Sequence, residues 1–162
     1  MDANTLHSLA TLIRSNRLAA LGTLRDGIPF VSMVVYAVSY DLTSFYLHLS
    51  RLAVHTRDLI ADPRLSLLIH ESDRGESDPQ TLARLTIQGD AATVSKTDSQ
   101  YEAIKSLYLK KFPDAEMRFS LGDFDLYRIE PKSARYVGGF AQAFNLTVEN
   151  FREAGKISSP RE

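Results

Sequence analysis

The chain has 162 residues, a net charge of −1, 44% hydrophobic and 24% charged residues, and no cysteine. This length favours one globular domain, and the lack of cysteine excludes both a disulfide framework and thiolate chemistry. The near-neutral charge argues against a broad nucleic-acid-binding face. No apolar run reaches the ~20 residues of a membrane span. The N-terminus lacks the charged start and apolar core of a signal peptide. We therefore predict a cytoplasmic protein with neither nucleic acid nor membrane as a partner.

The first third of the chain predicts a helix followed by a β-hairpin. Thr5–Ser15 has apolar residues along one helical side, and Ala19–Leu24 is a short apolar strand. Asp26-Gly27 is a strong hairpin signal because both residues tolerate positive φ. The partner strand, Ile28–Ser39, is long and almost wholly apolar, so we predict that it is central or buried on both faces.

Residues 45–69 predict a strand, a helix and a second strand. Phe45–Leu49 is strand-like, the apolar spacing then becomes helical, Pro63 ends the helix, and Arg64–Ile69 is again strand-like. Ser50 precedes the helix as a candidate cap, with Arg51 beside it. Free N–H groups at a helix start and an arginine together predict an anion site. An ordinary connection with a surface arginine remains the alternative.

The second half predicts more strands and one helix. A polar loop, residues 70–80, leads to strand Arg84–Val94, where Gly89 signals a bulge. A helix follows from Thr97, and two further strands run at 123–130 and 134–137. Closely spaced antiparallel strands around an apolar centre favour a closed barrel, because closure removes exposed edges. The predicted fold class is mainly β, a six-stranded antiparallel barrel with flanking helices.

Self-sufficient catalytic motifs are absent from the sequence. It contains no H-E-x-x-H, G-x-S-x-G, Walker loop or G-x-G-x-x-G, and no spaced cysteine–histidine cluster, so we predict no metal site. If the protein is an enzyme, a bound cofactor carries the reaction. His55 lies on the helix face of Leu52 and Leu59, where it is either a core histidine or a ligand contact.

Six segments together resemble a known family, the pyridoxamine 5′-phosphate oxidase-like FMN-binding split barrels, and within it the haem-utilisation branch. They are IPFVSMVVYAV, FYLHLSRLAVHTRDL, DPRLSLLI, ARLTIQGDA, FDLYRIEP and ARYVGGF. The resemblance implies a split-barrel domain at residues 1–144 and a C-terminal tail at 145–162. It also implies a homodimer with FMN at the subunit interface.

The same resemblance implies the cofactor contacts. The segment from residue 31 to 35 would line the flavin ring, Leu47 would touch the ribityl chain, and Ser50 and Arg51 would hold the phosphate. Gly138–Phe140 would close over the flavin. The full predicted set is Val31, Ser32, Met33, Val34, Val35, Leu47, Ser50, Arg51, His55, Arg84, Gly139 and Phe140.

The predicted function is that of an FMN-dependent oxidoreductase that acts on a small substrate or NAD(P)H. The alternative is a non-catalytic flavin- or haem-binding protein of haem utilisation. The haem ligand of the resembled branch lies in a C-terminal region, and this chain has no histidine after Phe140. Haem iron needs a strong axial donor. We therefore expect haem binding to be weak, or to use His7 or another group.

Overall fold

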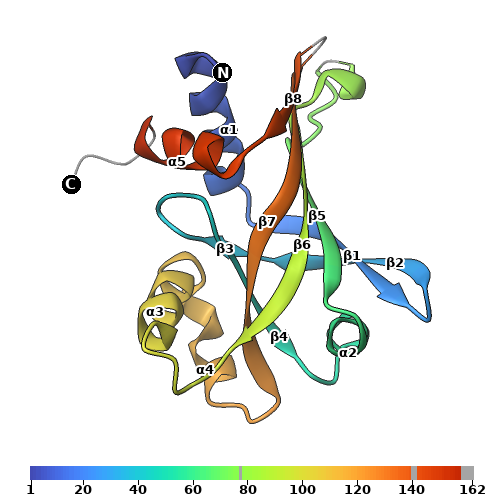
Figure 1. The fold of residues 1–162 in the computed structure, drawn as a ribbon, viewed down its shortest axis with the longest axis vertical. Coiled ribbons are helices and arrows are strands. Elements are labelled where there is room, and N and C mark those ends of the chain that lie inside the picture. The colour runs from blue at the N-terminus through green and yellow to red at the C-terminus, as the bar shows by residue number, and fades with distance from the viewer. Residues whose placement is uncertain (77, 140–141, 158–162) are drawn as a thin grey trace.

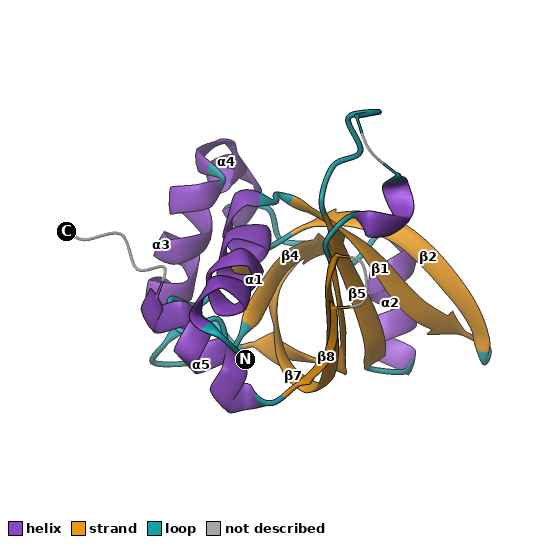
Figure 2. Cartoon of the chain, turned by 90° about the horizontal axis from the view of Figure 1, so that it is seen from above, coloured by secondary structure: helices purple, strands orange, loops and turns teal. Residues whose placement is uncertain are grey.

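The centre of the protein is one curled antiparallel sheet, seen in a computed structural model that describes residues 1–76, 78–139 and 142–157. Hydrogen-bonded neighbours follow the order β2-β1-β5-β6-β7-β4-β3, and β8 pairs with β7. Figure 2 shows the strands curving round into half a barrel with helices at its side. The predicted mainly β barrel with flanking helices is confirmed. The strands are β1 (Leu18–Arg25), β2 (Ile28–Val35), β3 (Ala37–Val38), β4 (Phe45–Ser50), β5 (Arg64–His70), β6 (Arg84–Val94), β7 (Phe124–Gly139) and β8 (Gln142–Leu146).

The helices cover the two ends of the sheet. In Figure 1, α1 and α5 lie side by side at one end, and α3 and α4 lie near β4 at the other. No helix of the described ranges is both long and apolar enough to cross a bilayer. The helices are α1 (Ala3–Ser15), α2 (Val54–Ala61), α3 (Tyr101–Lys111), α4 (Glu116–Phe119) and α5 (Val148–Ile157), with 3-10 turns at Pro79–Thr81 and Pro113–Ala115.

Two local signals of the sequence correspond to the turns and bulges they predict. Asp26 and Gly27 have φ values of 52° and 79° between paired strands β1 and β2, which confirms the hairpin. The pairing of β6 with β7 shifts between Gln88 and Gly89, which confirms the bulge. A Cβ atom at Gly89 would lie 2.7 Å from the Glu130 carbonyl oxygen, so only glycine allows the strands to approach so closely.

The prediction of one long, central strand at Ile28–Ser39 is wrong. The segment divides into β2 and β3, and β2 lies at one end of the sheet order rather than in its centre. Ile28, Val31 and Met33 are 69%, 66% and 67% exposed. Apolar composition predicted burial on both faces, but within a single chain nothing described covers the outer side of this strand. The described sheet has eight strands rather than the predicted six, since this segment divides and β8 is added, while the two strands predicted at 123–130 and 134–137 form the single strand β7.

The core lies between the inner side of the sheet and helices α1 and α5. Leu21, Leu47, Leu67 and Ile87 are fully buried there. Tyr36 donates from its hydroxyl to the Ile13 carbonyl at 2.6 Å, which joins the sheet to α1. A second apolar cluster packs α3 against β4.

The predicted domain boundary at residue 144 falls inside β8. The segment assigned to a tail continues as the end of β8 and then as α5, whose Phe151 and Ala154 are buried against the main core. We therefore propose that the described part of this segment belongs to the barrel domain.

Candidate functional site

The segment predicted to hold a phosphate is occupied by acidic partners. Arg51 donates to Asp125 Oδ2 at 2.6 Å and to the Gly122 carbonyl at 2.5 Å. The Ser50 hydroxyl donates to Asp123 Oδ2 at 2.5 Å. An incoming phosphate would meet two carboxylates here, and their charge opposes a second anion.

The helix start in this segment also differs from the prediction. α2 begins at Val54 with Ala53 as its N-cap, and no side chain caps it. Ser50 instead accepts a bond from the Leu52 N–H at 3.1 Å, inside the turn that precedes the helix. Ser50 therefore stabilises a turn, because it lies too far upstream to reach the N–H groups of the first helical turn.

Strand β2 presents the predicted ring-lining residues to opposite sides of the sheet. Val31 and Met33 are exposed on the outer side, whereas Val34 is buried in the core and Val35 is half-buried. The Ser32 hydroxyl lies 3.1 Å from His55 Nδ1. Successive residues of a strand alternate between faces, so one ligand surface receives only every second residue of this segment.

Asp58 anchors α2 beneath this strand. It is 6% exposed and accepts from the Thr23 hydroxyl at 2.9 Å and from Arg25 Nε at 3.2 Å. These hydrogen bonds, that of Arg25 first, lower the pKa of the Asp58 carboxyl. Burial lowers the pKa of His55, while the charge of Asp58 opposes that effect. His55 is therefore held neutral against Ser32.

The remaining predicted contacts are dispersed. Leu47 is fully buried in the core. Arg84 and Gly139 line one polar hollow of 370 Å³ near the end of β6 and β7. Phe140 lies outside the described residues. As ligand contacts, these residues stay predictions.

A different set of residues comes together on the side of the sheet opposite the core, which we call the outer face. The buried residues of β1, β5 and β6 alternate with exposed or half-buried ones, and the second group forms this face. Its apolar part is a hollow of 450 Å³ that β1 and β2 line. The members of the outer face used below are Leu18, Ala20, Val31, Met33, His70, Arg84 and Arg135.

His70 lies at the border of the apolar hollow and has a defined tautomer. Its Nδ1 is 2.8 Å from the carbonyl oxygen of Glu71. A carbonyl only accepts hydrogen bonds, so Nδ1 is the donor of this pair, and in the neutral imidazole Nε2 is the nitrogen that keeps its lone pair. This is the arrangement in which a neutral imidazole coordinates a metal.

Two arginines, Arg84 and Arg135, lie on the side of His70 that faces away from the apolar hollow. Arg84 is the register partner of His70, which brings the two Cβ atoms to about 5 Å. Arg135 lies on the next strand and lines the same polar hollow, together with Asp78. Arg84 Nη1 donates to the carbonyls of Gln80 and Leu82, and Arg135 Nη1 donates to Asn145 Oδ1. Neutral acceptors thus orient both guanidinium groups and leave their charge available.

Sequence reasoning missed His70 and Arg135. The sequence places His70 one residue beyond the predicted strand Arg64–Ile69, so composition assigned it to the loop. The signal was available in the alternation: Leu65, Leu67 and Ile69 point inward, so His70 extends the outward set. The described residues contain no cluster of three or more potential metal ligands.

Comparison with known proteins gives a family and several relatives. The profile of the family described as "CREG, beta-barrel" matches residues 5–153. The chloroplastic haem oxygenase HOZ of Arabidopsis thaliana is 45% identical over 119 residues, which are 74% of this chain and 35% of that protein. The haem oxygenase HutZ of Vibrio cholerae is 25% identical over 77% of this chain and 70% of its own length. The chain thus spans about a third of the Arabidopsis relative.

Solved structures agree with this assignment. A haem-binding protein from Mycobacterium smegmatis superposes with a TM-score of 0.80 at 28% identity, over 91% of this chain and 60% of its own. A putative pyridoxamine 5′-phosphate oxidase from Listeria innocua shares the fold, with a TM-score of 0.64 and 14% identity over 83% of this chain and 98% of its own. The resemblance to split barrels of the haem-utilisation branch is confirmed.

The prediction of FMN as the cofactor is wrong. The relatives named above include two haem oxygenases and a haem-binding protein. At the predicted phosphate contact Arg51, the guanidinium group is bonded to the carboxylate of Asp125, whose negative charge disfavours an anion there. The cytoplasmic location stays a prediction, since one relative is chloroplastic.

Proposed function

The chain belongs to the CREG β-barrel family, and from this premise we propose that its outer face binds haem between two copies of the chain. The observation that carries the proposal is the position of His70, whose Nδ1 is engaged by the Glu71 carbonyl and which lies between an apolar hollow and two arginines. The names of the relatives support the same ligand.

The residues fit the chemistry of haem in three respects. A haem has an apolar macrocycle, two carboxylates at one edge, and an iron that needs an axial donor. Leu18, Val31 and Met33 supply apolar surface beside the macrocycle. His70 would supply a nitrogen ligand for the iron, and Arg84 and Arg135 would supply positive charge for the carboxylates, which guanidinium groups bind with two parallel hydrogen bonds.

A second copy of the chain would complete the site. β2 has one unpaired edge within the described chain, and three of its large apolar side chains are more than 60% exposed. Contiguous exposed apolar surface marks an interaction site, and a two-fold dimer is the commonest arrangement. Sedimentation should give a dimer at micromolar concentration. A stable monomer there would contradict this part of the proposal.

Haem titration tests the ligand. Hemin added to the purified protein should give a saturable Soret shift. His70→Ala should raise the dissociation constant for haem by about 100-fold or more. Loss of a residue that only hydrogen-bonds to a metal ligand already lowers metal affinity by about 10–100-fold, and His70 would be the ligand itself. The matched control is His7→Ala on α1, which should titrate like the wild type. An unchanged Soret band in His70→Ala, with circular dichroism showing an intact fold, would remove His70 from the site.

Oxidative haem breakdown is a second candidate function, favoured by the relative with 45% identity. Bound haem supplies an iron that can activate dioxygen, and the chain holds and orients it. Haem-loaded protein with ascorbate and oxygen, in the presence of catalase, should lose its Soret band and release carbon monoxide. A Soret band that stays constant would favour storage or delivery of haem instead.

A further inference from the structure

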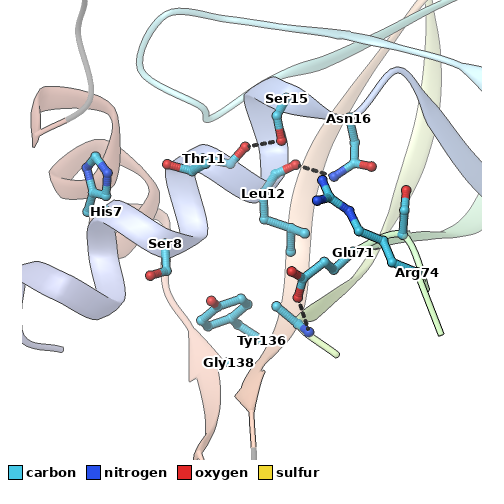
Figure 3. A pocket seen from close by; sticks show the side chains of 12 residues that line it. His7, Ser8, Thr11, Leu12, Ser15, Asn16, Glu71, Arg74, Tyr136 and Gly138 are labelled. Atoms are coloured by element: carbon cyan, nitrogen blue, oxygen red, sulfur yellow. Dashed lines mark hydrogen bonds between the residues drawn. The ribbon is translucent and has the colours of Figure 1, made fainter. Parts of the chain in front are cut away.

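A separate hollow of 580 Å³ lies on the opposite side of β7 from the arginine pair, between α1 and the loop that follows β5. Figure 3 shows Ser8 and Thr11 of α1, and Asn16 directly after this helix, facing Glu71, Arg74 and Tyr136 across the hollow. Polar side chains predominate among its lining residues, in contrast to the apolar hollow of the outer face. The proposed haem site uses none of these side chains.

Tyr136 brings an unsatisfied group to this hollow. The residue is 1% exposed, and its hydroxyl is buried without a hydrogen-bond partner among the described residues. Burial raises the pKa of Tyr136, so the hydroxyl stays protonated and can donate. A buried polar group without a partner is costly and requires an explanation. A bound molecule that accepts from this hydroxyl supplies one.

Gly138 keeps the tyrosine ring in this position. A Cβ atom built on Gly138 would lie 3.0 Å from Cε1 and 3.2 Å from the hydroxyl oxygen of Tyr136. Any larger residue at position 138 would therefore push the ring away. The absence of a side chain at Gly138 therefore allows the Tyr136 ring and its hydroxyl to lie beside the hollow.

The hollow also contains an acid and a base that do not neutralise each other. Glu71 Oε2 accepts from the Ala83 N–H at 3.2 Å, and its second oxygen has no bonded partner in the described part of the chain. No ion pair within 4.0 Å joins Glu71 to Arg74 in that part of the chain. Two unpaired charges of opposite sign that face one hollow are complementary to a molecule with both charges.

We propose that this hollow binds a free α-amino acid. Its ammonium group would face Glu71, its carboxylate would face Arg74, and a polar atom of its side chain would accept from the Tyr136 hydroxyl. The α1 hydroxyls of Ser8 and Thr11 give further polar contacts. Neither a simple anion nor a simple cation satisfies both charges.

Thermal-shift measurements with each common L-amino acid at millimolar concentration, followed by calorimetry of the strongest, test the proposal. We expect saturable binding that is lost when the same amino acid is N-acetylated or converted to its amide, because each change removes one charge. Equal binding of the blocked forms would overturn the proposal that the ligand carries both charges. No binding of any amino acid would overturn the site and return the hollow to water.

Variants separate a ligand contact from a structural role. Tyr136→Phe should weaken binding by about fivefold to tenfold, the range of one neutral hydrogen bond. It should not lower the melting temperature of the ligand-free protein, since the lost hydroxyl had no partner. Tyr40→Phe, at a tyrosine that is 68% exposed, is the matched control and should change neither quantity. Unchanged binding in Tyr136→Phe would remove the hydroxyl from the site.

Two further variants examine the charge and the ring position. Glu71→Gln should weaken binding about tenfold or more, the value of a hydrogen bond to a charged group, while Glu76→Gln in the same loop should not. Gly138→Ala should weaken binding by displacing the Tyr136 ring, without removing any polar group. Equal binding by Glu71→Gln and Glu76→Gln would overturn the role of the acid. Haem titration of Tyr136→Phe should match the wild type, so failure here leaves the haem proposal unaffected.

Discussion

Arg51 and Arg84 are both predicted ligand contacts near strand ends, yet their surroundings differ in charge. Arg51 donates to the carboxylate of Asp125, and that hydrogen bond raises its pKa. Arg84 donates to two backbone carbonyls. A carboxylate cancels the positive charge that an anionic ligand would need, whereas a neutral carbonyl orients the guanidinium group and leaves its charge intact. The acceptor that an arginine meets therefore decides whether it can hold an anion.

The same contrast separates the two surfaces around these residues. The Ser50–Arg51 turn faces Asp123 and Asp125 of the neighbouring strand end. The outer face presents two arginines together with an apolar hollow and a histidine whose Nδ1 is engaged by a backbone carbonyl. The first surface resists an anion, and the second matches an amphiphilic dianion with a metal at its centre.

The largest expected effect concerns Leu47, which the sequence assigned to a ligand and the structure places in the core. Leu47→Ala should reduce the free energy of unfolding by about 2–5 kcal/mol, the range for emptying a buried leucine site. Chemical denaturation measures it, and Leu52→Ala at a residue that is 76% exposed is the control. A loss no larger than that of the control would mean that Leu47 does not support the core.

The next effect is a pH dependence at His48, which is adjacent to Leu47 on β4. Burial, with lesser help from Arg118, lowers the pKa of His48 from 6.5 to about 4. Its ring stacks on Phe119 with centroids 3.7 Å apart. The unfolded chain takes up the proton first as the pH falls. The contribution of His48 to the free energy of unfolding is therefore fully present above pH 6.5 and is lost as the pH falls toward 4. The loss amounts to about 3 kcal/mol at most.

Denaturation of the wild type and His48→Gln between pH 7.5 and about 5 measures this contribution, a range in which most carboxylates stay ionised. The variant should be less stable at neutral pH but should lose less stability on acidification. A slope in His48→Gln as steep as that of the wild type would assign the pH dependence to other groups.

The arginines of the outer face give the third effect. Arg84→Ala and Arg135→Ala should each weaken haem binding by about 1.5–3 kcal/mol, the value of a hydrogen bond to a charged group. Haem dimethyl ester lacks both carboxylate charges, so its weaker binding should be nearly indifferent to either change. Soret titration with both ligands measures the difference. Equal losses for haem and its ester would mean that these arginines shape the hollow rather than bind carboxylates.

The smallest expected effect is at Arg51. Its ion pair with Asp125 is partly exposed and screened by solvent, so Arg51→Ala should leave the free energy of unfolding almost unchanged. Haem affinity should change by less than about twofold, because the residue lies outside the proposed site. A loss of haem affinity as large as that of Arg84→Ala would reverse the comparison between the two arginines.

Several features followed from the sequence alone because they depend on local geometry. Asp26-Gly27 predicts its hairpin, since few other residues take positive φ at both positions. Gly89 predicts its bulge, and the spacing of apolar residues predicts which strand positions face inward. The six resembling segments identified the split barrel and its haem-utilisation branch.

Only the tertiary structure decided which charges meet and which strand is exposed. Asp123 and Asp125 are 73 and 74 residues away from the side chains they bind, and the pairing of β4 with β7 brings them there. The pairing of β5 with β6 likewise places His70 beside Arg84. Electrostatic interactions depend on distance in space, which strand register sets, and no local pattern around Arg51 or His70 records the partner.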